Sequence, residues 1–130
     1  MTYPNIVSVA TIAGESLGFN LTTTASTALM TVSTHYIIKV NSILVANVDG
    51  TNAATVDVRV VKASFNPLGL TATSTGTGTF YLAKTVNVPA DDVLVLVDTS
   101  FYLQEGDVLQ GRASVALDLD LFVSYEVIID

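Results

Sequence analysis

Alternation of β-branched and polar residues is the feature that most constrains what this chain can fold into. In 54–63, "ATVDVRVVKA", the side chains of Val56, Val58 and Val60 alternate with polar ones, and 79–88 follows the same pattern. Successive side chains of a strand point to opposite faces, and branching at Cβ suits a pleated sheet. No sustained apolar stripe has the 3.6-residue period of a helix. The sequence therefore predicts an all-β protein.

About eight strands are expected, separated by turn residues. Segment 36–48 is apolar on both faces, which predicts a central or bent strand, and 92–98 is a continuous apolar run, which predicts burial on both faces. This number of short strands is typical of an antiparallel β-sandwich of the jelly-roll kind. The predicted strands are 17–23, 26–32, 36–48, 54–63, 79–88, 92–98, 108–117 and 119–129.

The first residues break this pattern. Residues 1–16 lack clean alternation, so we expect an extended N-terminal arm there and a single β-sandwich domain over 17–130. The arm's apolar side chains are predicted to contact another surface, such as that of a neighbouring subunit; they are Ile6, Val7, Val9 and Ile12. No signal peptide is expected at this N-terminus. The longest predicted loop is 65–79, which is rich in Thr, Ser and Gly.

Charge and cysteine content exclude several classes of partner. Half of the residues are hydrophobic, 13% are charged, and the formal net charge is −7. The basic residues look scattered, which argues against nucleic-acid and membrane partners. They are Lys39, Arg59, Lys62, Lys84 and Arg112. With no cysteine, the chain has no disulfide or thiolate chemistry.

The acidic stretch Asp49-Gly50-Thr51-Asn52 separates two alternating runs. An Asp-Gly pair in that position is a strong hairpin signal, because glycine tolerates positive φ. The alternative is a calcium ion held by Asp49, Asn52 and backbone carbonyls, although the later glutamate of a helix-flanked calcium loop is missing. The sequence favours a plain turn.

A second acidic feature is "ALDLDLFV", 116–123. The period of a strand places Asp118 and Asp120 on one face, with Leu117, Leu119 and Leu121 on the other. Two carboxylates at that spacing would suit a metal ion or acid–base work. A half-exposed strand has the same pattern, and the sequence favours that interpretation.

The chain offers no recognisable catalytic set. His35 is the only histidine, and no phosphate loop, nucleophile elbow or triad accompanies it. We therefore expect no enzyme and no cofactor, with His35 at the surface or a strand edge. Arg112 is expected to pair with an acid on a neighbouring strand. The aromatic side chains of Phe101, Tyr81, Tyr102 and Tyr125 are expected to pack across strands and in the core.

Four segments together resemble small virion structural proteins of tailed bacteriophages, of the kind found in marine phages and cyanophages. They are "VNSILVANVDGTNAATVDV" (40–58), "YLAKTVNVPADDVLVLVD" (81–98), "FYLQEGDVLQGRAS" (101–114) and "DLDLFVSYEVI" (118–128). The resemblance covers most of 36–130 and implies a β-sandwich of the particle. It carries no catalytic residues.

The resemblance implies a head decoration, neck or tail position. Of these we expect a capsid decoration (cement) protein that binds the outside of the major capsid protein lattice as a homotrimer, with the arm residues Ile6, Val7, Val9 and Ile12 in contact with the capsid or a neighbouring subunit. Its expected location is the virion, after synthesis in the cytoplasm of a host bacterium. Two alternatives stay open. One is a neck, tail or fibre component of the virion. The other is a carbohydrate-binding module that uses Tyr81, Tyr102 or the pair Asp118 and Asp120.

Overall fold

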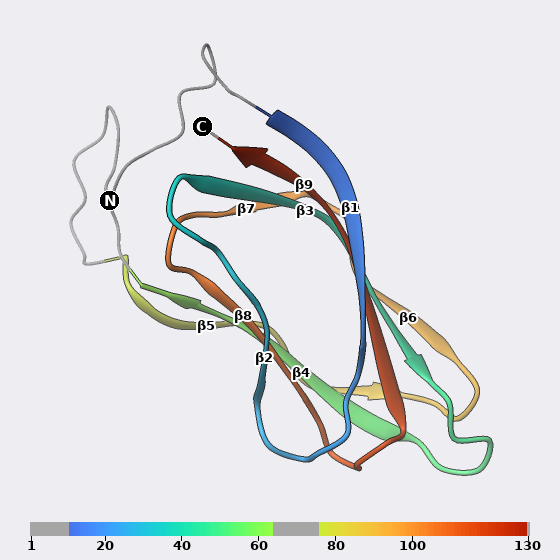
Figure 1. The fold of residues 1–130 in the computed structure, drawn as a ribbon. Helices are drawn as coiled ribbons and strands as arrows, with labels where there is room; N and C mark the ends of the chain where they lie inside the picture. Colours follow the sequence, from blue (N-terminus) through green and yellow to red (C-terminus); the bar gives the residue numbers. More distant parts are fainter. Residues whose placement is uncertain (1–10, 64–75, 130) are drawn as a thin grey trace.

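Two antiparallel sheets pack face to face in the computed structural model, which describes residues 11–63 and 76–129 (Figure 1). The first sheet contains β1 (Thr11–Asn20), β9 (Leu119–Ile129), β3 (Tyr36–Asn47) and β6 (Val93–Val97), in that order, and β7 (Phe101–Leu103) also pairs with β3. The second contains β2 (Thr27–Thr31), β8 (Val108–Ala113), β4 (Ala54–Lys62) and β5 (Gly78–Val88). The predicted all-β antiparallel sandwich is confirmed.

The strand order is that of a jelly roll. Strand β3 pairs with β6 through Ile43–Ala46 and with β7 through Ile38–Val40, so β6 and β7 occupy one position as an interrupted strand. Counted as one, they give the orders 1-8-3-6 and 2-7-4-5, in which every two consecutive strands except β4 and β5 lie in different sheets. The expected position of 36–48 is confirmed, because β3 is central and carries a register shift between Val40 and Ser42.

Period-2 alternation builds the core. On β4 and β9 every second side chain points between the sheets and is buried, while its neighbours are partly exposed. Removing these apolar surfaces from water is the main stabilising contribution. The fully buried aliphatic side chains are Val40, Ile43, Val45, Val56, Val58, Val88, Leu103, Leu109, Leu119, Leu121 and Val123.

The first strand begins earlier than the sequence indicates. Strand β1 starts at Thr11 and pairs with β9 along its whole length, so a domain boundary at residue 16 is wrong for residues 11–16. The alternation there is masked because Glu15 points inward, where its carboxylate accepts a hydrogen bond from the Tyr125 hydroxyl (2.8 Å). Ile12 lies on the outer face of this strand and is 60% exposed. The remaining arm residues, Ile6, Val7 and Val9, lie outside the described residues.

Two other strand predictions need correction. Strand β6 is an edge strand with one exposed apolar face, so the expected burial of 92–98 on both faces is wrong. Strand β8 ends at Ala113, and the apolar side chains of Val115 and Leu117, which suggested a longer strand, are exposed in the following turn. The short β7 was not expected, because three residues carry too little periodicity to detect.

The turn after β3 is confirmed, but it does not form a hairpin. Strand β3 belongs to the first sheet and β4 to the second, so 48–53 crosses between the sheets. Gly50 does not adopt positive φ. The bend is instead closed by Asp49, whose Oδ1 accepts the Thr51 N–H at 2.8 Å.

Most of the predicted loop 65–79 lies outside the described residues, and β5 begins within it, at Gly78. No helix in the described part of the chain is long and apolar enough to cross a membrane.

Candidate interaction surfaces

An open apolar hollow of about 480 Å³ lies on the outer face of the first sheet. Strands β1, β9, β3 and β6 present their outward side chains here. The strand register brings these side chains together, because Gly18 is opposite Phe122, Phe122 opposite Leu44, and Leu44 opposite Val95. All four residues point to the outer face of the sheet, so the pairing of the strands places them side by side in the hollow.

The floor and rim of the hollow differ in chemistry. Because Gly18 has no side chain, the ring of Phe122 can lie beside it, with Cδ1 3.5 Å from where a Cβ would be. At the rim, the Asn20 side-chain amide donates to Oδ1 of Asp120 at 2.7 Å. Gly18, Leu44, Ala46, Val93 and Phe122 line the hollow, and the exposed Val95 lies beside it, opposite Leu44. We refer to these six residues as the apolar hollow. Its floor offers van der Waals contact and its rim offers one polar pair.

Large apolar side chains of this surface are open to water. Phe122 is 47% exposed, Val93 57% and Val95 56%. A contiguous apolar patch on a folded domain is typical of a contact surface. The sequence does carry a sign of this surface, the continuous apolar run 92–98. The same run also fits a strand buried on both faces, which is what the sequence predicts.

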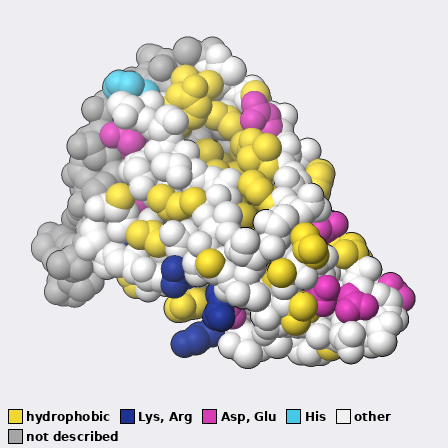
Figure 2. Space-filling view, turned by 60° about the horizontal axis from the view of Figure 1, so that its bottom comes forward, with side chains coloured by type: hydrophobic (Ala, Val, Ile, Leu, Met, Phe, Trp, Pro, Cys, Tyr) yellow, Lys and Arg dark blue, Asp and Glu magenta, His cyan; other side chains and the backbone are white. Residues whose placement is uncertain are grey.

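A second surface is the outer face of the β2-β8-β4-β5 sheet. It carries Arg59 on β4, Lys84 on β5 and Arg112 on β8. These were expected to be scattered, and the structure corrects that expectation, because separate segments of sequence become neighbouring strands. Figure 2 shows the Lys and Arg side chains of this view gathered in one place. We call Arg59, Tyr81, Lys84 and Arg112 the basic face.

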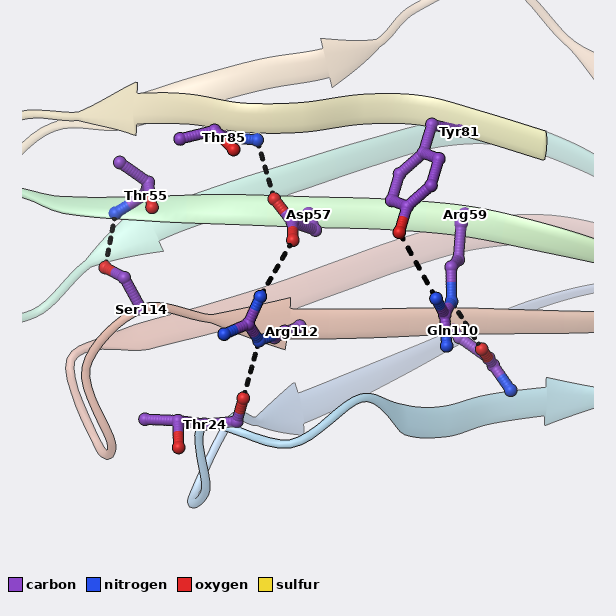
Figure 3. Close-up of polar contacts among 9 residues, drawn as sticks. All are labelled: Thr24, Thr55, Asp57, Arg59, Tyr81, Thr85, Gln110, Arg112 and Ser114. Atoms are coloured by element: carbon purple, nitrogen blue, oxygen red, sulfur yellow. Dashed lines mark hydrogen bonds and ion pairs between the residues drawn. The ribbon is translucent and has the colours of Figure 1, made fainter. Parts of the chain in front are cut away.

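Hydrogen bonds hold two of these cations in fixed positions (Figure 3). Arg59 donates from Nε to Gln110 Oε1 at 2.7 Å and from Nη1 to the Tyr81 hydroxyl at 3.2 Å. Arg112 donates from Nε to the Thr24 carbonyl at 2.6 Å. These contacts use only part of each guanidinium, which has five N–H donors.

Arg112 also confirms a prediction, because it pairs with the acid opposite it on a neighbouring strand. Its Nη1 lies 3.4 Å from Oδ2 of Asp57. The other carboxylate oxygen of Asp57 accepts the Thr85 N–H at 2.6 Å, where Thr85 has positive φ. Asp57 therefore anchors the irregular part of β5 as well as balancing one cation of the basic face.

Tyr81 lies between cations. The Arg59 guanidinium carbon is 5.8 Å from the centre of its ring and the Lys84 ammonium is 5.1 Å from it. Both distances suit cation–π attraction. The expectation of core packing is wrong for Tyr81 and Tyr102, which are exposed, and correct for Tyr125 and for Phe101, which packs against the core.

Three turns that carry acidic residues come together where β3, β5 and β8 end, and we call Asp49, Asp91, Asp92 and Asp118 the acidic corner. The Asp91 N–H donates to the Asp49 carbonyl (3.1 Å). The Val48 N–H donates to the Asp118 carbonyl (2.8 Å). These backbone bonds bring three separate turns together, and Figure 2 shows Asp and Glu side chains gathered at one end of the molecule.

The acids of this corner perturb each other. Oδ2 of Asp118 is buried and has no hydrogen-bond partner. Burial, together with the nearby charge of Asp49, raises the pKa of Asp118 above its ordinary value. Hydrogen bonds from the Thr51 backbone and the Asn52 side chain lower the pKa of Asp49. One carboxyl of the pair is thus held in its ionised form while the other resists ionisation.

The four metal-ligand candidates do not assemble into one site. Asn52 turns its amide nitrogen toward Oδ2 of Asp49 (3.3 Å). Asp118 lies just before β9 beside Asp49, whereas Asp120 bonds to Asn20. Within 11–63 and 76–129, no three His, Asp or Glu side chains form a group that could hold a metal ion.

In the same region, the expectation that Leu117, Leu119 and Leu121 share one strand face is wrong for Leu117. Leu117 is 66% exposed and has φ +70°, so it belongs to the turn before β9. Leu119 and Leu121 are buried as expected. His35 is exposed, as predicted; its φ is also positive, and its N–H donates to Oε2 of Glu105 at 2.9 Å.

One acid was not singled out from the sequence. Asp107 is fully buried, and its carboxylate accepts from the Lys62 ammonium (2.5 Å) and the Gln104 N–H (2.8 Å). In the sequence, Asp107 ends the short stretch Glu105-Gly106-Asp107, whose residue types are those of an ordinary turn. Lys62 is therefore neutralised within the sandwich and does not add to the basic face.

No protein-family model matches the chain, and no curated protein is significantly similar to it in sequence.

Proposed function

We propose that this chain is a bacteriophage virion structural protein, a capsid decoration protein that binds the outside of the major capsid protein lattice as a homotrimer. The observation that carries the proposal is the apolar hollow, where Phe122, Val93 and Val95 are about half exposed. The sequence resemblance to small phage virion proteins directs the proposal toward a particle.

The proposed mechanism is adhesion. An apolar side chain from the capsid surface would fill the hollow and remove Phe122 and Leu44 from water. Burial of apolar surface contributes about 25 cal/mol for each Å², so a patch of this kind adds useful affinity when repeated by every subunit. The Asn20–Asp120 pair at the rim would remain in contact with water or with polar groups of the partner.

The architecture is compatible with this role by analogy alone. Jelly rolls occur in viral capsid proteins and also in lectins and cupins, so the fold does not select the function. The surface supports adhesion more directly. A long edge strand such as β1 also presents unpaired backbone groups, which oligomer formation can cover.

Copy number on the particle is the first test. Virions whose genome encodes this chain are purified, and the chain is quantified against the major capsid protein. We expect a copy number of the same order as the capsid protein. A ratio of a few per hundred would move the chain to the neck, tail or fibres, and absence from the particle would overturn the proposal.

A binding experiment then tests the hollow itself. Particles stripped of the chain are incubated with wild-type protein or with the double variant Val95→Ser/Phe122→Ser. We expect the variant to lose at least about tenfold in affinity, because two apolar contacts are replaced by hydroxyl groups. The matched control is Val115→Ser, an exposed valine in the turn after β8, which should bind as wild type. Equal binding of all three would exclude the hollow.

A further inference from the structure

The basic face carries an excess of positive charge within an acidic protein. Of its three cations, Arg59, Lys84 and Arg112, only Arg112 forms an ion pair within the described residues, with Asp57, whereas the whole chain has a formal net charge of −7. The Lys84 ammonium lies over the Tyr81 ring, and Arg112 remains half exposed. The face therefore keeps N–H donors that can bind a partner placed on this sheet.

The acidic corner carries the opposite excess. The two ion pairs among the described residues join Lys62 to Asp107 and Arg112 to Asp57, and neither involves the corner. Burial, and after it the neighbouring negative charge of Asp49, raises the pKa of Asp118. A cation placed against this corner would relieve the repulsion between the two acids.

Each charged surface has exposed apolar neighbours. On β5, Tyr81 itself is exposed, and so is Leu82, which follows it in the chain. Beside the corner, Val48 is exposed too. Aromatic residues and Arg are enriched at protein interfaces, and charged pairs there specify orientation while apolar contacts contribute affinity. Both surfaces therefore have the composition of an interface.

We propose that the basic face of one copy of this chain binds the acidic corner of a second copy. The carboxylates of Asp91 and Asp92 would pair with Arg59 and Lys84 across the contact, with Tyr81 between them. We choose a second copy as the partner because its charge is complementary. Every copy of the chain that carries the basic face also carries the acidic corner, so the two surfaces are present at equal concentration. The inference deepens the proposed function by naming the contact that forms its oligomer.

The geometry of such a contact limits the assemblies it can build. Two different patches of one chain make a heterologous contact, which closes into a ring or continues as an open chain. A closed ring of three is the trimer of the proposed function. The contact leaves the apolar hollow, on the other sheet, free for a capsid protein.

Charge reversal with rescue tests the proposal on the isolated chain. The variants are Arg59→Glu/Lys84→Glu, Asp91→Lys/Asp92→Lys, and the quadruple variant that combines them. Mass is measured by light scattering during gel filtration. We expect wild type to form an oligomer, each double variant to weaken association at least about tenfold, and the quadruple variant to recover it. High salt should weaken the wild-type oligomer.

Controls separate the interface from folding and from net charge. Lys39→Glu reverses a cation on β3, in the other sheet, and should leave association unchanged. Because Asp91 has φ +56°, where lysine is strained, Asp91→Asn/Asp92→Asn provides a second corner variant that keeps the turn. It should also weaken association, and thermal unfolding verifies that each variant is folded.

Three results would overturn the proposal: a monomeric wild type at high concentration, an oligomer that tolerates both reversals, or a quadruple variant that stays monomeric while folded. None of them bears on particle binding, which is measured separately with the hollow variants. A monomer that still decorates capsids would refute this contact and leave the adhesive role intact.

Discussion

Phe122 lies directly opposite Gly18 in the β1–β9 ladder, and its ring lies beside the space that a methyl group at Gly18 would take. A Cβ at Gly18 would meet the ring at 3.5 Å, which is ordinary van der Waals contact. Neither the ring nor the backbone therefore requires glycine at this position. A methyl group would fit beside the ring, and the φ of Gly18 is not in the left-handed region.

Gly18→Ala is expected to stabilise the fold. Alanine restricts the unfolded chain and gains contact with Phe122, so the free energy of unfolding should rise by roughly 0.5 kcal/mol. Urea unfolding checks this value. Gly111→Ala serves as the contrast, because its Cβ would lie 3.0 Å from Leu29 Cδ1 within the core. Overpacking should cost about 1 to 3 kcal/mol there.

Asp118→Asn is expected to raise the melting temperature at neutral pH and to have little effect in acid. The raised pKa of Asp118 means that its contribution to stability is present below the unfolded value of 3.8 and is lost as the pH rises through the folded-state pKa. Asparagine keeps the shape and removes the repulsion from Asp49. Melting curves at neutral pH and below the unfolded pKa test this, with Asp98→Asn as an exposed control.

Tyr125→Phe is expected to reduce the loss of folding stability at alkaline pH. Burial and the hydrogen bond to Glu15 raise the pKa of Tyr125 from 10.0 to about 12. The associated stability is present below pH 10.0 and is lost as the pH rises through about 12. The variant should therefore lose less stability than wild type across this window. Identical alkaline unfolding curves would contradict the assignment.

Asp107→Ala is expected to be the most destabilising of these substitutions. It leaves the Lys62 ammonium and the Gln104 N–H without their buried acceptor, and breaking a buried pair typically costs about 3 kcal/mol. Chemical denaturation measures the loss. Asp107→Asn, which keeps an acceptor oxygen but no charge, should fall between alanine and wild type.

The sandwich was predictable because its signal is local. Alternation along 54–63 identifies both the strand and its buried face, and it holds for β4 without correction to the inner side chains. The predicted ends of strands were wrong where a single residue interrupts or extends the alternating pattern. Glu15 points inward to Tyr125 and hides half of β1, and Leu117 continues an apolar pattern into a turn.

The candidate surfaces were much less predictable than the strands. Each is assembled from three or more strands or turns, so its residues are far apart in the chain. Arg59, Lys84 and Arg112 look scattered until β4, β5 and β8 become neighbours. The run 92–98 did carry a signal for the hollow, but periodicity cannot distinguish a strand covered on both faces from an edge strand with one exposed apolar face.

By itself, the sequence determined the fold class, the inner faces of the strands and the nature of the bends, because these depend on backbone preference and on side chains one or two positions apart. Only the tertiary structure decided that Asp49 and Asp118 share a corner, that β3 and β4 lie in opposite sheets, and that three cations share one face. Those facts depend on which strands pair, and pairing is a property of the whole chain rather than of any segment of it.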